Sequence, residues 1–369
     1  MCDEPNASVK PGMTSAADAA EYPLDSTHAS KKTITFVIPC YNSAEYMDHC
    51  IQSILGVDKD IEIIIVDDGS SDATAQKADA WAKRSPHIIR VIHQENSGHG
   101  GAVMAGLRAA RGEYFKVVDS DDWLDRTSRG VLLARLRHFI SSGADVDLVV
   151  CNYVYEHVLT GSRKVIRYRG ALPANKIISW DDIGTFGIGQ YIMMHAAIYR
   201  TQVLRDSGLD MPKHTFYVDN VLVYQPLPYV NKLYYLPVNL YRYFIGREDQ
   251  SVNERVMLGR LDQQMRVTKI LADSYTLPDD ISSPRLARYM FNYLMIIVTA
   301  SSIFATIRGD AEALKMRKDM WKNIEAKSPA MAKKLRHHPL VWGANRQSSL
   351  GTAAAKKLYR LAQHLYHFN

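Results

Sequence analysis

Apolar, β-branched runs alternate with stretches of helical periodicity over the first 150 residues of the chain. The runs that predict strands are 33–38, 61–66, 88–93, 113–118 and 147–151. Between them, apolar residues recur at helical spacing and predict helices that begin near Ser43, Asp72, Gly101 and Thr127. Strands that are apolar on both faces and joined by helical crossovers are typical of a parallel sheet. We therefore expect an α/β fold, with a doubly wound, mainly parallel sheet and helices on both faces.

The pattern changes after about residue 152, where tyrosine-rich segments with shorter periodicity begin. From about residue 255 onward the spacing favours long helices. We predict a mobile tail over 1–30, an α/β domain over 31–255 with halves 31–150 and 151–255, and a C-terminal α-helical region over 256–369. The most apolar stretch, 289–307, is interrupted by polar residues such as Asn292, Thr299 and Ser301, which favour a buried helix over a membrane span.

Composition narrows the class of protein. The 369 residues are 47% hydrophobic and 23% charged, which is typical of globular chains. The four cysteines form no Cys-x-x-Cys pair, so we expect reduced thiols rather than a disulfide scaffold or structural zinc. Because the first 30 residues lack the apolar core of a signal peptide, we expect a cytoplasmic location.

The net charge of +6 is unevenly distributed along the chain. Residues 311–369 carry 12 Lys and Arg against 3 Asp and Glu, a local +9, so the preceding part carries −3. Such asymmetry can mark peripheral contact with an anionic membrane, here at its inner face, or only a solvated helical surface. We expect no nucleic-acid partner, and homo-oligomerisation is left open.

Three polar loops follow predicted strands, at 67–72, 96–101 and 119–122. The carboxyl ends of parallel strands meet at one edge of a sheet, so we expect these loops to converge on a ligand site. In the third loop, Asp119 and Asp121 point to the same side of an extended strand end. Two such carboxylates suit Mn²⁺ or Mg²⁺, which would neutralise charge on a diphosphate leaving group. The alternative is a solvated turn rich in helix-capping aspartates.

The other two loops suggest nucleotide chemistry. In Asp67-Asp-Gly-Ser-Ser-Asp72, a carboxylate can accept from the imide N–H of uracil, although Asp-Gly-Ser is also ordinary turn chemistry. Asn96-Ser-Gly-His-Gly-Gly101 opens a helix, and its glycines let backbone approach a phosphate. It matches neither Gly-x-Gly-x-x-Gly nor a Walker loop. A lone histidine such as His99 is more often packed than catalytic, and only its place in this loop favours a role.

Four ordered motifs carry a family resemblance: Phe36-Val-Ile-Pro-Cys-Tyr-Asn42, Val66-Asp-Asp-Gly-Ser-Ser-Asp72, Asn96-Ser-Gly98, and Gly112-Glu-Tyr-Phe-Lys-Val-Val-Asp-Ser-Asp-Asp122. In these motifs the chain resembles the family-two glycosyltransferases, strongly over 33–140 and more weakly to about 255. The resemblance implies a GT-A fold and inverting sugar transfer. The Gln-x-x-Arg-Trp signature of processive synthases is absent, which favours the bacterial non-processive type.

The resemblance also implies roles for single residues. The nucleotide-sugar would be contacted by Pro39, Tyr41, Asp67, Asp68, Asn96, Gly98, His99, Asp119 and Arg247. Tyr41 would stack near the base, Asp68 would read uracil, and Asp119 would lie near the ribose. Asp121 would hold the metal, with Asp119 and Asp122 as further ligands or anchors.

The general base of the family corresponds best to Asp219, in Thr215-Phe-Tyr-Val-Asp-Asn220. Val218 replaces the first acid of the usual pair, and Asp219 could instead only cap a helix. We expect transfer from a nucleotide-diphosphate sugar, with a UDP-sugar favoured, to a hydroxyl of a glycan or lipid-linked acceptor in the cell envelope. The alternatives are a catalytically silent nucleotide-sugar-binding scaffold and an aspartyl-nucleophile phosphohydrolase. Trp123 disfavours the phosphohydrolase, which usually carries Thr or Val there.

Overall fold

The computed structural model describes residues 32–157, 160–187, 190–246 and 254–345. The chain divides into two compact units, 1–30 and 31–369, and the described residues belong to the second. The predicted tail and Arg247 therefore lie outside the described residues.

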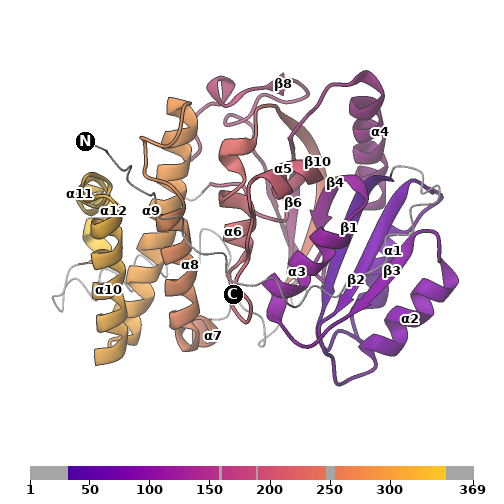
Figure 1. The fold of residues 1–369 in the computed structure, drawn as a ribbon, viewed down its shortest axis with the longest axis horizontal. Helices are drawn as coiled ribbons and strands as arrows, with labels where there is room; N and C mark the ends of the chain where they lie inside the picture. The colour runs from indigo at the N-terminus through magenta and orange to yellow at the C-terminus, as the bar shows by residue number, and fades with distance from the viewer. Residues whose placement is uncertain (1–31, 158–159, 188–189, 247–253, 346–369) are drawn as a thin grey trace, which may run out of the picture. The chain divides into compact units, whose positions relative to one another are not determined.

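Four parallel strands form the first half of the central sheet, in the order β3-β2-β1-β4 (Figure 1). They are β1 (Lys32–Cys40), β2 (Ile61–Asp67), β3 (Ile89–His93) and β4 (Gly112–Val117). Every residue of β2 is buried, as expected for a strand covered on both faces. The strands predicted from apolar runs in this region are confirmed.

Long-range pairing builds the second half of the sheet. Its strands are β5 (Trp123–Leu124), β6 (Leu148–His157), β7 (Ser162–Ile166), β8 (Ile177–Ile178), β9 (Ala197–Arg200) and β10 (Leu233–Ile245). Strand β9 runs antiparallel between β4 and β6, while β10 runs parallel to β6, so β6 and β10 point the same way as β1–β4. Strand β6 continues six residues beyond the predicted end at Cys151, because β7 and β10 pair with that extension.

Helices cover both faces of the sheet. The connecting helices are α1 (Met47–Ile54), α2 (Thr74–Arg84), α3 (Gly98–Ala109), α4 (Arg126–Ser142), α5 (Thr201–Asp206) and α6 (Asp219–Tyr224). Right-handed crossovers place α1 and α2 on one face and return α3 across the other. Hydrogen bonds join neighbours on each face: Asp48 of α1 accepts from Trp81 of α2, and Arg205 of α5 donates to Ala110 at the end of α3. The expected fold class is confirmed.

The chain continues into helices after the sheet, shown in orange to yellow in Figure 1. They are α7 (Glu254–Gly259), α8 (Leu261–Ser274), α9 (Pro284–Arg308), α10 (Ala311–Lys327), α11 (Pro329–His337) and α12 (Pro339–Ala344). By length and composition α9 could cross a membrane, with a mean hydropathy of 1.7, but 72% of its most apolar window is buried. Helix α9 packs against α8, α10 and α12, so the stretch 289–307 is the buried helix that its polar residues predicted.

Candidate functional site

The loop after β4 is fixed by one buried tyrosine. Tyr241 of β10 accepts a hydrogen bond from the backbone N–H of Asp119 at 3.1 Å and donates to Oδ2 of Asp122 at 2.6 Å. The second oxygen of Asp122 accepts from the N–H of Phe244 at 2.8 Å. Strand β5 pairs antiparallel with β10 beside these contacts, through Leu124 opposite Tyr241. Strand β10 therefore holds the backbone of Asp119 and the carboxylate of Asp122 in place.

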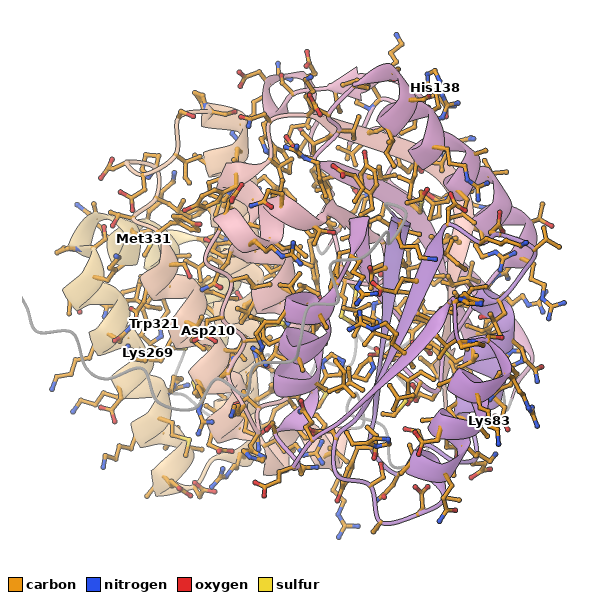
Figure 2. All side chains as sticks on the ribbon, turned by 45° about the vertical axis from the view of Figure 1, so that its right-hand side comes forward. Lys83, His138, Asp210, Lys269, Trp321 and Met331 are labelled. Carbon is orange, nitrogen blue, oxygen red and sulfur yellow. The ribbon has the colours of Figure 1, made fainter. Side chains whose placement is uncertain are left out.

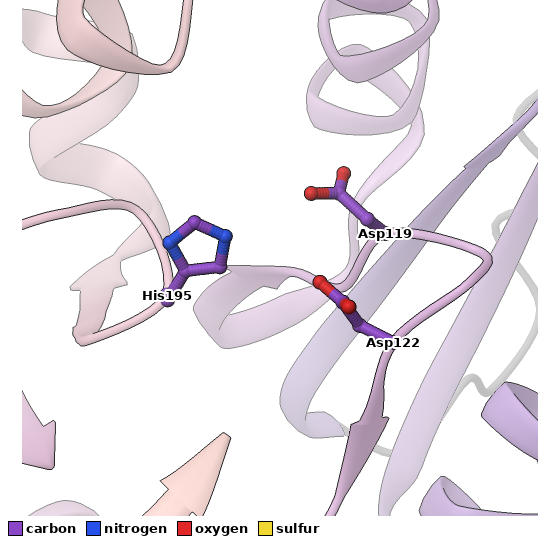
Figure 3. A group of neighbouring side chains, drawn as sticks. All are labelled: Asp119, Asp122 and His195. Atoms are coloured by element: carbon purple, nitrogen blue, oxygen red, sulfur yellow. The ribbon is translucent and has the colours of Figure 1, made fainter. Parts of the chain in front are cut away.

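A third side chain joins this loop from a distant part of the sequence. Figure 3 shows Asp119 and Asp122 on one loop and the ring of His195 on another segment facing them, and their ligand atoms all lie within 4.8 Å of one another. His195 is buried, and its Nδ1 atom has no hydrogen-bond partner. Carboxylates are ligands that suit Mn²⁺, and the imidazole of a histidine is a common metal ligand that can complete such a set. The residues present therefore fit a divalent cation.

Aromatic rings and a buried lysine orient His195. Its ring stacks on Tyr243 with centroids 4.4 Å apart and meets the edge of Tyr241 at 4.7 Å. The ammonium of Lys116 donates to the carbonyl oxygen of His195 at 2.8 Å and lies 5.0 Å from the centre of the Tyr241 ring. Sequence reasoning missed His195, because its only signal was a buried position in an apolar segment before β9.

Burial and neighbouring charges shift the pKa values of Asp122 and Asp119 in opposite directions. Burial, with the charges of Asp121 and Asp119, raises the pKa of Asp122 well above its ordinary value. Burial raises the pKa of Asp119, but the 2.8 Å hydrogen bond to His99 and the positive charges of its neighbours together hold that pKa below its ordinary value. Burial lowers the pKa of His195 to about 4, so its ring is neutral at neutral pH. The mutual repulsion of the aspartates in this loop, which raises the pKa of Asp122, is what a bound cation would relieve.

Asp121 lies half-buried in the same loop but is outside this three-residue cluster. Burial lowers the pKa of nearby Lys116 to about 8, so the ammonium keeps its charge at neutral pH. The charges of Asp119 and Asp122 oppose this lowering, so Lys116 lies within their electrostatic reach. The expected ligand roles of Asp121, Asp119 and Asp122 stay predictions.

The loop after β2 is tied to the start of α3 through Asp68. One oxygen of this buried carboxylate accepts from Gln94 Nε2 at 2.6 Å and from the N–H of Ser97 at 2.8 Å. The other accepts from the N–H of Gly98 at 2.7 Å. Asp68 therefore serves the first N–H groups of α3, as a helix cap would. Its reading of uracil stays a prediction, as does the supporting role of Asp67, which accepts from His93 Nδ1 at 2.9 Å.

The glycines of 96–101 allow another segment of the chain to approach. The N–H of His214 donates to the carbonyl of Ser97 at 2.9 Å. A Cβ on Gly98 would stand 2.8 Å from the His214 nitrogen, and one on Gly100 would stand 2.6 Å from the Pro212 oxygen. Gly98 also has a φ of +75°, which favours glycine. This contact brings the segment before Asp219 against the loop that carries His99.

Asp219 is the first residue of α6 and lies half-buried. Burial raises its pKa to about 6, partly offset by the charge of His99, while the charge of Asp119 adds to the rise. The neighbouring Asn220 is held from α9, whose Tyr293 hydroxyl donates to Asn220 Oδ1 at 3.0 Å. The fold thus brings Asp219 into the electrostatic reach of His99 and Asp119, from which it is far separated in sequence.

The remaining predicted residues line the same edge with different exposure. Tyr41, directly after β1, is 56% exposed and free to stack on a planar ligand, whereas Pro39 is buried inside the strand. Asn96 is exposed and donates to the backbone oxygen of Asp68 at 3.0 Å. The nucleotide roles of Pro39, Tyr41, Asn96 and Gly98 stay predictions.

The chain is similar to known glycosyltransferases in sequence. Residues 35–202 match the family model described as glycosyl transferase family 2. EpsH of Bacillus subtilis (strain 168), a glycosyltransferase by assignment, is 39% identical over 129 residues, which are 35% of this chain and 36% of EpsH. The glycosyltransferase GlyG of Streptococcus pneumoniae serotype 4 is 38% identical over 124 residues, 32% of this chain and 38% of GlyG. The chain thus matches little more than a third of the length of these relatives.

A solved structure extends the likeness over nearly all of the chain. TarS of S. aureus in complex with UDP-GlcNAc has a TM-score of 0.62 and 17% identity, covering 89% of this chain and 92% of that chain. At this identity the likeness establishes the fold alone, a GT-A sheet followed by helices. Together with the ordered motifs, the sequence match identifies residues 35–202 as a family-two glycosyltransferase domain.

Proposed function

We propose that the chain transfers a sugar from a nucleotide-diphosphate sugar to an acceptor hydroxyl, with inversion at the anomeric carbon. The observation that carries the proposal is the meeting of Asp219, with its pKa raised to about 6, and the Asp119–His99 pair at one edge of the sheet. A general base must be ionised at neutral pH and must also be basic enough to accept a proton. A carboxylate with a pKa of about 6 meets both requirements.

The donor would occupy the edge formed by the loops after β1, β2 and β4. Tyr41 offers an exposed ring for the nucleobase, and the relatives' structures support a nucleotide ligand, since TarS was solved with UDP-GlcNAc and with UDP. A UDP-sugar is the favoured donor. GDP-Man is the alternative on the same grounds, because PcManGT from Pyrobaculum calidifontis was solved with GDP-Man and Mn²⁺, at a TM-score of 0.51, 13% identity, and coverage of 89% of this chain and 87% of that chain.

Mn²⁺ or Mg²⁺ would be held by Asp119, Asp122 and His195, with Asp121 in the same loop as a further ligand. When bound, the cation supplies charge neutralisation for the diphosphate leaving group. The chain's own residues set the protonation states of the site: His99 keeps Asp119 ionised, and Tyr241 fixes Asp122.

The reaction step is a single displacement. Asp219 accepts the proton of the acceptor hydroxyl while the acceptor oxygen bonds to the anomeric carbon, and the bond from that carbon to the diphosphate oxygen breaks. The electron pair of the broken bond leaves with the nucleoside diphosphate. The acceptor class, a cell-envelope glycan or lipid-linked glycan, stays a prediction, as do the cytoplasmic location, non-processive transfer and homo-oligomerisation.

A catalytically silent scaffold is the second candidate, and Val218 is the residue that raises it. Val218 is 1% exposed and packs in the core, where an unpaired carboxylate would be costly. The missing first acid therefore has a packing explanation and leaves Asp219 able to act alone.

The test is release of nucleoside diphosphate from a panel of UDP-, GDP- and dTDP-sugars in the presence of Mn²⁺ and candidate acceptors. We expect turnover with one nucleotide class and a loss of about 10²–10⁴-fold in Asp219→Asn. Asp210→Asn is the matched control, since Asp210 is an exposed carboxylate on another segment (Figure 2). Donor binding without turnover in the wild type, unchanged in Asp219→Asn, would instead favour the silent scaffold.

A further inference from the structure

A groove on the C-terminal helices combines basic side chains with exposed apolar ones. It has a volume of about 760 Å³ and is lined from α10, α11 and α12. The residues used below are Leu314, Lys318, Trp321, Lys322, Arg336 and Trp342. Figure 2 labels Trp321 on α10 and Met331 on α11 in this part of the molecule. Nothing in the proposed sugar transfer uses this groove.

The charge of the groove is strongly positive. Four of its lining residues are Lys or Arg and one is acidic, Glu325, whose carboxylate is bound by Arg336 at 2.9 Å. The difference, four minus one, leaves three positive charges. Arg317 also lines the groove, is 4% exposed and donates to Thr306 Oγ1 at 2.7 Å. Within the described part of the chain, its guanidinium forms no ion pair with a carboxylate. A desolvated guanidinium beside exposed lysines favours an anionic ligand.

Two apolar side chains stand out of the same surface. Trp342 is 55% exposed and Leu314 is 39% exposed. The guanidinium of Arg336 lies 5.1 Å from the ring centre of Trp321, so cationic and aromatic groups are interleaved across the groove. Tryptophan beside lysine and arginine is the combination that membrane interfaces favour, because the ring sits at the headgroup level while the cations reach lipid phosphates.

The charge of the chain's C-terminal segment makes an external anionic partner a better ligand for the groove than that segment itself. Residues 346–369 carry Arg346, Lys356, Lys357 and Arg360 and no acidic residue, so they have the same sign of charge as the groove. Like charges disfavour covering the groove with this segment. Because α9 is largely buried by its neighbouring helices, contact with a membrane through α10–α12 would be peripheral.

We propose that the face around this groove docks on the surface of an anionic phospholipid bilayer. Trp342 and Leu314 enter the headgroup region, and Lys318, Lys322 and Arg336 bind lipid phosphates. The inference is independent of the proposed sugar transfer, because it rests on other residues and its test needs no turnover.

The test is flotation of the full chain with vesicles of phosphatidylcholine, alone or with about a quarter phosphatidylglycerol. We expect binding only to the anionic vesicles, weakened as salt rises. Lys318→Gln with Lys322→Gln is expected to lower the partition coefficient about tenfold or more, since each lysine near such a surface contributes strongly. The matched control is Lys83→Gln with Lys176→Gln, two exposed lysines of the sheet-containing part.

A second variant separates insertion from charge. Trp342→Ala leaves the net charge unchanged and is expected to weaken binding about tenfold, whereas Tyr229→Ala, at a site 43% exposed, is expected to leave it unchanged. Circular dichroism checks that each variant is folded. The proposal is overturned by equal binding to neutral vesicles, by losses that the control pairs match, or by losses confined to Lys356→Gln with Lys357→Gln. It is also overturned if light scattering shows a dimer that Trp342→Ala dissociates, since the face would then join two copies.

Discussion

Replacing Tyr241 by phenylalanine removes one hydroxyl on which the candidate donor site depends. That hydroxyl is fully buried, accepts from the N–H of Asp119 at 3.1 Å and donates to Asp122 at 2.6 Å. The ring itself can stay in place against His195 and Lys116, so the change is confined to these two hydrogen bonds. Asp119 would keep a half-buried N–H without this partner, and Asp122 would keep one donor, Phe244, instead of two.

The magnitude follows from the two groups left unsatisfied. A buried donor or acceptor without its partner costs about 1–3 kcal/mol, and a charged one costs more. We therefore expect Tyr241→Phe to lower the free energy of unfolding by about 2–5 kcal/mol. Loss of an outer contact that orients metal ligands weakens metal sites by about 10–100-fold, so Mn²⁺-dependent nucleotide binding should fall by a similar factor.

Urea unfolding followed by circular dichroism measures the first effect, and titration of UDP in the presence of Mn²⁺ measures the second. Tyr229→Phe is the control, because Tyr229 is 43% exposed and a surface change of this kind alters stability by less than about 0.5 kcal/mol. The reasoning is refuted if Tyr241→Phe unfolds as the control does and binds UDP as the wild type does.

Three further predictions concern residues around the same site. The kcat/KM of the wild type should fall below a pH of about 6, where Asp219 takes up a proton, and a flat profile from pH 5 to 8 would exclude it as the base. The pKa of His195 is about 4 in the folded chain and near 6.5 when unfolded, so the unfolded state binds its proton first as the pH falls and stability drops between these values. His195→Asn should remove on the order of 3 kcal/mol of that drop in urea unfolding, and an identical pH dependence would contradict the assignment. Gly98→Ala should cost about 1–3 kcal/mol, because a Cβ would meet His214 at 2.8 Å with φ at +75°, and an unchanged melting temperature would contradict the contact.

Local pattern was sufficient for the first half of the fold. Strands β1 and β2 are buried on both faces, so their apolar runs stand out from the sequence, and the carboxyl ends of parallel strands had to meet at one edge. The position of the 119–122 loop followed from that argument. The extension of β6 to His157 did not, because it depends on pairing with β7 and β10, which no local period encodes.

Sequence reasoning predicted only part of the site, again because long-range strand pairing is not encoded locally. His195 and Tyr241 reach the loop through β9 and β10, whose places in the sheet are set by long-range pairing. The glycines at 98 and 100 also admit the backbone of 212–214, which the sequence did not indicate, while their expected approach to a phosphate stays a prediction. A glycine-rich sequence indicates that another group approaches the backbone closely, but it does not identify whether that group is a ligand or another segment of the chain.

Titration calorimetry of UDP, with and without Mn²⁺, tests the central claim most directly, that the loop after β4 forms a metal-dependent nucleotide site. The wild type and Asp210→Asn should bind UDP only when Mn²⁺ is present, and Asp121→Asn should lose that binding. Binding of UDP that is indifferent to Mn²⁺, or that Asp121→Asn retains in full, would contradict the account.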